Sequence, residues 1–128
     1  MLPPALFTVI TVIAILWLTL FPKPLGDEPP RLFPGADKIV HGLMFGFLTV
    51  MMLLDWQRRH RWTKVTWGLA TLYATSNSIF GLATECAQSM MGIGREFEWA
   101  DTLADTVGCF VFAVLWMFTQ KNWLRNTP

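Results

Sequence analysis

The stretch ALFTVITVIAILWLTLF, Ala5–Phe21, decides the fold class because it contains no charged residue. Three more apolar runs follow, Ile39–Leu54, Val65–Met91 and Thr102–Phe118, and each contains at most one Asp, Glu, Lys, Arg or His. Each run is close to the roughly 20 residues that a helix needs to cross about 30 Å of hydrocarbon. Four such runs leave no polar face for water. The sequence therefore predicts an all-α membrane protein with four transmembrane helices.

The composition supports one membrane domain, residues 1–128, with spans at about 5–21, 37–55, 65–91 and 101–118. Hydrophobic residues make up 53% of the chain and charged residues 15%, whereas soluble domains have about 25% charged residues. This balance excludes a disordered chain, a disulfide scaffold and a basic nucleic-acid-binding domain, so we expect no nucleic-acid partner. The first run has no basic segment before it and no cleavage site after it, so we expect it to be retained.

The basic residues predict the orientation of the spans. The segment QRRHRWTK, Gln57–Lys64, holds four Lys or Arg residues between the second and third spans, and the C-terminal segment adds Lys121 and Arg125. Short cytoplasmic loops are enriched in Lys and Arg. We therefore predict that this loop and both termini are cytoplasmic, which is an N-in/C-in topology. The proline-rich segment 22–35 and the short segment around Arg95 then lie outside.

Ionisable and amide side chains gather at the predicted outer ends of the second, third and fourth spans. Asp37 and His41 are spaced i, i+4, as are Asp101 and Asp105, so each pair shares one helix face. A charge that faces lipid costs about 2.5–3.5 kcal/mol at mid-bilayer, so we expect these faces to meet one another. Glycines would let the backbones approach closely. The candidate ligand-binding residues are Asp37, Lys38, His41, Glu85, Gln88, Arg95, Asp101 and Asp105, and the glycines are Gly81, Gly92 and Gly108.

Some of these residues also have a purely structural interpretation. Asp37 and Asp101 lie where helices are predicted to begin, and a carboxylate there caps free N–H groups and suits the helix dipole. Glu85 lies in the C-terminal half of its predicted helix, where the dipole disfavours it. Its structural alternative is an ion pair with Lys38 or Arg95. Taken together, however, ionisable residues inside a membrane favour a functional site.

Three segments carry a resemblance to a known family. Asp37–Phe45, DKIVHGLMF, resembles the D-K-x-x-H-x-x-x-[YF] motif of the VanZ-like family. Glu85–Gln88, ECAQ, resembles its E-x-x-Q motif, and Arg95–Gly108, REFEWADTLADTVG, resembles its R-x5-D-x3-N-x2-G segment. The order and spacing agree from about Asp37 to Phe118. The resemblance implies a small multi-pass protein of the bacterial inner (plasma) membrane, connected with the cell envelope and with resistance to the glycopeptide antibiotic teicoplanin.

Two residues depart from the family pattern. Asp105 stands where the family usually has Asn, so an acid replaces an amide. Phe45 stands where Tyr is frequent, so a hydroxyl is missing. Both departures fall within the motifs, and the detailed chemistry of the family therefore does not transfer directly to this chain.

The first functional hypothesis is that the cluster binds an anionic headgroup of an envelope lipid, lipid-linked glycan or glycopeptide at the outer leaflet. Arg95 and Lys38 would hold the anion, because a guanidinium matches the oxygens of a phosphate. Asp37, Glu85 and Asp101 would orient these cations or bind hydroxyls. The expected partners are therefore membrane lipids and envelope molecules that carry a lipid.

The second hypothesis is a membrane-embedded hydrolase or transferase on a lipid-linked envelope substrate. His41 could act as a general base or nucleophile and Glu85 as a general acid. The sequence has no HExxH or GxSxG motif to support this. A divalent metal could suit Asp37, His41, Glu85 and Asp101. No Cys/His metal spacing is present, so we assign no metal site. The sequence does not identify a cofactor.

Two further hypotheses are a transporter and a structural subunit. A transporter would need more spans or an oligomer, and the cluster lies at one end of the helices rather than at the midplane. In a non-catalytic subunit of an envelope complex, the cluster would only hold helices together. That interpretation predicts that Glu85→Gln lowers stability as much as it lowers function.

Overall fold

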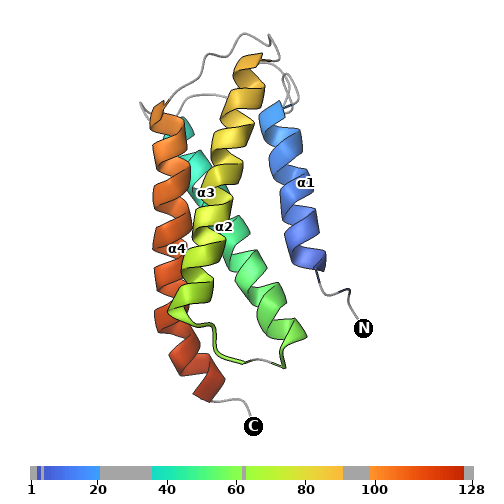
Figure 1. The fold of residues 1–128 in the computed structure, drawn as a ribbon, viewed down its shortest axis with the longest axis vertical. Helices are drawn as coiled ribbons and strands as arrows, with labels where there is room; N and C mark the ends of the chain where they lie inside the picture. The colour runs from blue at the N-terminus through green and yellow to red at the C-terminus, as the bar shows by residue number, and fades with distance from the viewer. Residues whose placement is uncertain (1–2, 4, 21–35, 62, 91–98, 126–128) are drawn as a thin grey trace.

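The computed structural model of this chain describes residue 3 and residues 5–20, 36–61, 63–90 and 99–125. These residues form four helices (Figure 1). The helices are α1 (Leu6–Leu20), α2 (Ala36–Arg59), α3 (Trp67–Met90) and α4 (Trp99–Arg125). The predicted all-α fold class is confirmed, and each helix covers most of the apolar run that predicted it.

Helix α2 continues past its apolar run and ends in basic residues. Arg58 and Arg59 lie in its last turn, where positive charge suits the negative end of the helix dipole. Two residues further on, Arg61 has a φ of 53°, which is the left-handed conformation that commonly follows the end of a helix. The chain thus turns back toward α3 within a few residues.

Among the described residues, two helix segments are long and apolar enough to cross a membrane, Lys38–Arg59 and Trp99–Gln120. Helix α1 contributes a shorter apolar segment, Leu6–Leu18. All four helices also expose large apolar side chains, a surface that soluble monomers rarely present. This surface is typical of a membrane protein. The exposed side chains include Ile10, Ile13, Leu43, Phe47, Leu72, Ile79, Leu103 and Phe118.

The helices alternate in direction along the bundle. Helices α1 and α4 lie on opposite sides, and α2 and α3 cross each other between them (Figure 1). Helices α2 and α4 therefore run parallel, and both begin at the end of the bundle where α3 finishes. The contacts between α2 and α4 are the most extensive of any pair of helices in the described part of the chain.

Glycines allow α2 and α4 to cross with their backbones in contact. A methyl group on Gly108 would lie 2.6 Å from the carbonyl carbon of Gly42, and one on Gly46 would lie 2.9 Å from the carbonyl oxygen of Gly108. Gly42 and Gly46 are spaced i, i+4, so they lie on one face of α2. This is the small-residue spacing that lets membrane helices approach closely.

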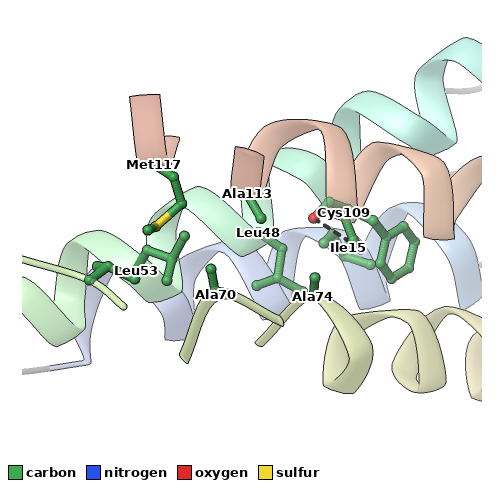
Figure 2. Close-up of a cluster of buried hydrophobic side chains, with 10 residues drawn as sticks. Ile15, Leu48, Leu53, Ala70, Ala74, Cys109, Ala113 and Met117 are labelled. Atoms are coloured by element: carbon green, nitrogen blue, oxygen red, sulfur yellow. Dashed lines mark hydrogen bonds between the residues drawn. The ribbon is translucent and has the colours of Figure 1, made fainter. Parts of the chain in front are cut away.

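The apolar core runs along the inside of the bundle (Figure 2). It contains side chains from all four helices, and small residues such as Ala74 and Ala113 keep the helices close together. The thiol of Cys109 also contacts the carbonyl oxygen of Phe45 across α2 and α4, at 3.6 Å. The buried core residues are Ile15, Phe45, Leu48, Leu53, Val65, Ala70, Ala74, Cys109, Ala113 and Met117.

A network of buried amides, which we call the amide network, joins the ends of α2 and α4. Gln57 donates to the side-chain oxygen of Gln120 at 3.0 Å and accepts from the indole of Trp116 at 3.1 Å. Gln120 in turn accepts from the backbone N–H of Val65 at 2.9 Å and donates to the carbonyl oxygen of Val65 at 3.0 Å. The segment before α3 is thereby fixed to α4.

A carboxylate of α2 holds the N-terminal end of α1. Asp55 of α2 accepts hydrogen bonds from the backbone N–H of Thr8 at 2.7 Å and from its hydroxyl at 2.8 Å. The first N–H groups of a helix have no partner within the helix, so Asp55 caps α1 from a neighbouring helix. Arg58 donates to the same carboxylate at 2.8 Å and covers the ring of Phe7 at 4.9 Å.

Candidate functional site

Two side-chain contacts, one of them an ion pair, connect α2 and α4 where both helices begin. The Nζ atom of Lys38 lies 3.1 Å from Oδ1 of Asp101, and Nδ1 of His41 lies 3.1 Å from Oδ1 of Asp105. The parallel helices bring these residues together in register, one turn apart on each helix. The structure thus unites side chains that are 63 and 64 positions apart in the sequence.

The sequence near the start of each helix explains these positions. Helix α4 begins at Trp99, so Asp101 lies in its first turn, where the positive end of the dipole favours a carboxylate. Lys38 lies in the first turn of α2, which begins at Ala36. A cation there is unfavourable for the dipole alone, and the contact with Asp101 compensates for it.

Helix α3 contributes Glu85 to the same end of the bundle. Glu85 is 2% exposed, and Asp105 is fully buried. A methyl group on Gly81 would lie 2.7 Å from Oδ2 of Asp105, so the absence of a side chain at Gly81 makes room for that carboxylate. Helices α3 and α4 run in opposite directions, and Gly81 faces Asp105. Glu85, one turn after Gly81, therefore lies close to the level of Asp101, one turn before Asp105. We call Lys38, His41, Glu85, Asp101 and Asp105 the charged cluster.

The members of the charged cluster differ in how far a ligand could reach them. The side chain of Lys38 is 35% exposed, whereas those of Asp101 and Asp105 are 2% and 1% exposed. A group that approaches the described part of the cluster from outside therefore meets a cation, while these carboxylates stay covered. In this arrangement Asp101 holds Lys38 in position rather than facing the solvent.

The carboxylate of Asp105 is only partly satisfied. Its Oδ1 contacts His41, but its Oδ2 is buried without a hydrogen-bond partner among the described residues. The hydroxyl oxygen of Thr102, on the neighbouring turn of α4, is also buried without a hydrogen-bond partner among the described residues. Buried polar atoms usually have partners, and exceptions tend to occur at functional or strained positions.

The contact between His41 and Asp105 orients the imidazole. A neutral imidazole that donates from Nδ1 to the carboxylate carries its basic lone pair on Nε2. The family's usual Asn could also accept this hydrogen bond through its carbonyl oxygen. Asp105 therefore keeps the acceptor and places a second oxygen where Asn would carry an NH2 donor, which is the chemical consequence of the departure from the family pattern.

Three of the predicted site residues cannot be assessed in the same way. Arg95 lies outside the described residues. Asp37 and Gln88 are placed in α2 and α3, but their side chains are outside what the structure describes. Within the described part of the chain, no three His, Cys, Asp or Glu side chains are arranged to hold a metal ion. Of the divalent-metal set Asp37, His41, Glu85 and Asp101, the side chain of Asp37 lies outside the described residues.

The structure also reveals residues that the sequence reasoning did not single out. Gly42 and Gly46 set the spacing of α2 from α4, and their GxxxG pattern in an apolar helix could have identified them. Of the glycines expected to allow close approach, Gly81 and Gly108 do so, whereas Gly92 lies outside the described residues. Partners such as Asp55 with Thr8 have no comparable pattern in the sequence.

Comparison with known protein families finds a match over most of the chain. The family model described as VanZ/LLP1 matches residues 7–120. This range contains all four of the described helices except the first residue of α1 and the last five residues of α4. No curated protein and no solved structure matches the chain.

Proposed function

This chain belongs to the VanZ/LLP1 family, and on that basis we propose that it binds an anionic headgroup of an envelope lipid or lipid-linked glycan. In this proposal the protein crosses the bacterial inner membrane four times, with both termini in the cytoplasm. The charged cluster then lies at the outer leaflet. The motif resemblance in the sequence and the family match agree on the family, while the ligand is our own inference.

The arrangement of charge along the bundle supports this orientation. The basic residues of the segment Arg58–Lys64 lie at the opposite end of the bundle from Lys38, Glu85 and Asp101. Lys and Arg are enriched on the cytoplasmic side of membrane proteins. If the basic segment is cytoplasmic, the charged cluster faces outward.

The observation that carries the proposal is a partly exposed cation in an otherwise buried charged cluster. Lys38 is 35% exposed, and the carboxylate that fixes it is 2% exposed. An incoming anion would thus contact Lys38 without facing Asp101. A lysine ammonium has three donors, so it can keep its contact with Asp101 while donating to a phosphate or carboxylate of a ligand.

Native mass spectrometry of the gently solubilised protein would test this proposal. We expect the parent protein to carry a bound anionic lipid, and Lys38→Ala to lose it. Lys64→Ala is the matched control, because this lysine is exposed at the opposite end of the bundle. Lys38→Arg, which keeps the positive charge, should retain the lipid. Equal lipid binding in all four proteins would contradict the proposal.

A second candidate function is favoured by the contact between His41 and Asp105. A carboxylate that orients an imidazole is a recurrent arrangement in general base catalysis. A hydrolase or transferase would use His41 as the base and Glu85 as the acid on a lipid-linked envelope substrate. Product formation by the purified protein, lost in His41→Gln while lipid binding persists, would support catalysis. Unchanged turnover in His41→Gln would exclude this role of His41.

The connection with antibiotic response can be tested in cells. In a strain that lacks the protein, we expect the parent gene to restore teicoplanin tolerance and Lys38→Ala not to restore it. If Glu85→Gln loses both stability and tolerance in parallel, the charged cluster acts mainly as a helix contact. That outcome would favour a non-catalytic subunit of an envelope complex.

A further inference from the structure

Two arginines at the end of α2 have no acidic partner in the described part of the chain. Arg59 is the last residue of α2, Arg61 follows two residues later, and both are exposed. Neither forms an ion pair with a described residue. The sequence contains no Asp or Glu between Asp55 and Glu85. These two guanidinium groups are therefore available to an anion from outside the chain.

The acid nearest to them in the sequence is already occupied. Asp55 accepts from Arg58 at 2.8 Å through Oδ1, and from the N–H and hydroxyl of Thr8 through Oδ2. His60, between the two arginines, turns back toward α2. Its Nδ1 donates to the carbonyl oxygen of Trp56 at 2.7 Å, and its ring stacks on the indole at 4.3 Å. Contacts within the protein thus account for these neighbouring polar side chains, but not for the two arginines.

Tyr73 of α3 adds a hydrogen-bond donor near Arg59. Its ring packs against the apolar core, and Arg59 is close enough for its positive charge to act on the phenol group. The Tyr73 hydroxyl makes no hydrogen bond to a described residue, and it is not among the described polar atoms that are fully enclosed. A phosphate has several acceptor oxygens, so it can accept from this hydroxyl and from a guanidinium at the same time.

The apolar surface beside these groups favours a lipid as the source of the phosphate. Leu72, next to Tyr73, is 58% exposed, and Trp67 at the start of α3 is 54% exposed. In the membrane arrangement proposed above, such side chains face the hydrocarbon and its boundary, where Tyr and Trp are enriched. The arginines lie at the end of this surface, and long basic side chains near helix ends extend to the depth of the headgroups.

We propose that Arg59, Arg61 and Tyr73 form a second anion site, which binds the headgroup phosphate of an anionic lipid in the leaflet opposite to the charged cluster. The inference rests on the four-span arrangement of the proposed function, but not on its ligand at Lys38. Charge complementarity supports it, because anionic lipids are attracted to basic segments beside membrane-spanning helices. The Tyr73 hydroxyl makes this a defined site rather than a diffuse attraction.

Lys64 allows a comparison within the same end of the bundle. It is exposed like the arginines, but it lies on the segment that crosses the end of the bundle from α2 to α3 (Figure 1). A diffuse attraction depends on net charge, so losing Lys64 would weaken it as much as losing one arginine. A site made by Arg59, Arg61 and Tyr73 depends mainly on its own members.

Native mass spectrometry of the full-length protein in detergent, titrated with phosphatidylglycerol, tests the proposal. We expect the parent to bind two lipids, one at Lys38 and one at the arginine site. Arg59→Gln and Arg61→Gln should each weaken one binding step by about fivefold, which corresponds to about 1 kcal/mol for a basic residue near a membrane surface. Tyr73→Phe keeps the ring and should weaken the same step by a similar or larger factor, because it removes a hydrogen bond to a charged group.

Lys64→Gln is the matched control and should bind phosphatidylglycerol as the parent does. An equal loss in Lys64→Gln and in the arginine variants would show a diffuse attraction and overturn the proposal. Unchanged binding in Tyr73→Phe would also overturn it. So would equal binding of phosphatidylcholine, or displacement of the lipid by inorganic phosphate, which would identify a soluble anion as the ligand.

The failure of this site and the failure of the site at Lys38 give different results. If Lys38→Ala binds as many lipids as the parent while Arg59→Gln binds fewer, the headgroup site of the proposed function is wrong and the arginine site holds. If Lys38→Ala loses a lipid while Arg59→Gln does not, only the arginine site is wrong. The unfolding midpoint in detergent checks that each variant is folded. If Arg59→Gln lowers it, Arg59→Lys keeps the charge without the guanidinium fork and should bind more weakly than the parent.

Discussion

The contact between Gly42 and Gly108 predicts a large effect from one added methyl group. In Gly108→Ala the new Cβ would lie 2.6 Å from the carbonyl carbon and 2.7 Å from the Cα of Gly42. Both are backbone atoms, so the clash cannot be relieved by a side-chain rotation, and α2 and α4 must move apart. Overpacking of this kind costs about 1–3 kcal/mol, while alanine regains about 1 kcal/mol of helix propensity over glycine.

We therefore expect Gly108→Ala to lower the free energy of unfolding by up to about 2 kcal/mol, measured by denaturant titration in detergent micelles. Separating the helices also lengthens the contact between Lys38 and Asp101, so the bound lipid should decrease in native mass spectrometry. Gly68→Ala is the control, because its Cβ would meet no heavy atom closer than the Thr66 hydroxyl at 4.0 Å. That variant should be as stable as the parent or slightly more stable. A Gly108→Ala protein as stable as Gly68→Ala would refute the close helix crossing.

Three further predictions concern the polar contacts. Asp55→Ala removes the cap of α1 and should cost about 0.5–2 kcal/mol, seen as a lower unfolding midpoint in detergent. Gln57→Leu leaves the indole of Trp116 without its acceptor and should cost about 1–3 kcal/mol for each buried group left unpaired; a neutral result in the same titration would contradict the amide network. Asp105→Asn keeps an acceptor for Nδ1 of His41 and should leave the unfolding midpoint close to that of the parent. Asp105→Leu removes this acceptor and should lower the midpoint clearly.

The sequence was sufficient to predict the four helices and to place the residues of the charged cluster at one end of them. Apolar runs of 16 to 27 residues determine where helices form, and the alternation of direction then fixes which ends meet. The observed helix ends differ from the predicted ones. Helix α2 continues to Arg59 and α4 to Arg125, beyond the ends of their apolar runs. Charged residues can extend a helix beyond the apolar region, and hydropathy alone does not show where such a helix stops.

The individual partners in the cluster could not be predicted in the same way. Asp101 was one of three carboxylates expected to orient the cations, and the structure places it 3.1 Å from Lys38. The pairing of His41 with Asp105 depends on the parallel offset of α2 and α4. The backbone contact between Gly42 and Gly108 sets that offset. The hydrophobic pattern of one helix does not show where it will contact another helix.

The two ends of the contact between α2 and α4 differ in a way that bears on function. At one end, neutral amides join the helices, and the side-chain nitrogen and oxygen atoms of Gln57 and Gln120 have hydrogen-bond partners. At the other end, charged groups join them, although charges are costly in a membrane. There, Oδ2 of Asp105 remains without a partner among the described residues.

Holding helices together does not require such charges. The glycine contact already brings α2 and α4 together, and the amide network shows that this chain can fix the same two helices with neutral, satisfied groups. A buried ion pair is often no better for stability than apolar residues of similar volume. In the described part of the chain, Oδ2 of Asp105 has no hydrogen-bond partner and Lys38 is partly exposed, so the charged cluster is poorly explained as a helix contact alone. This difference between the two ends is the strongest physical argument for a ligand at the charged one.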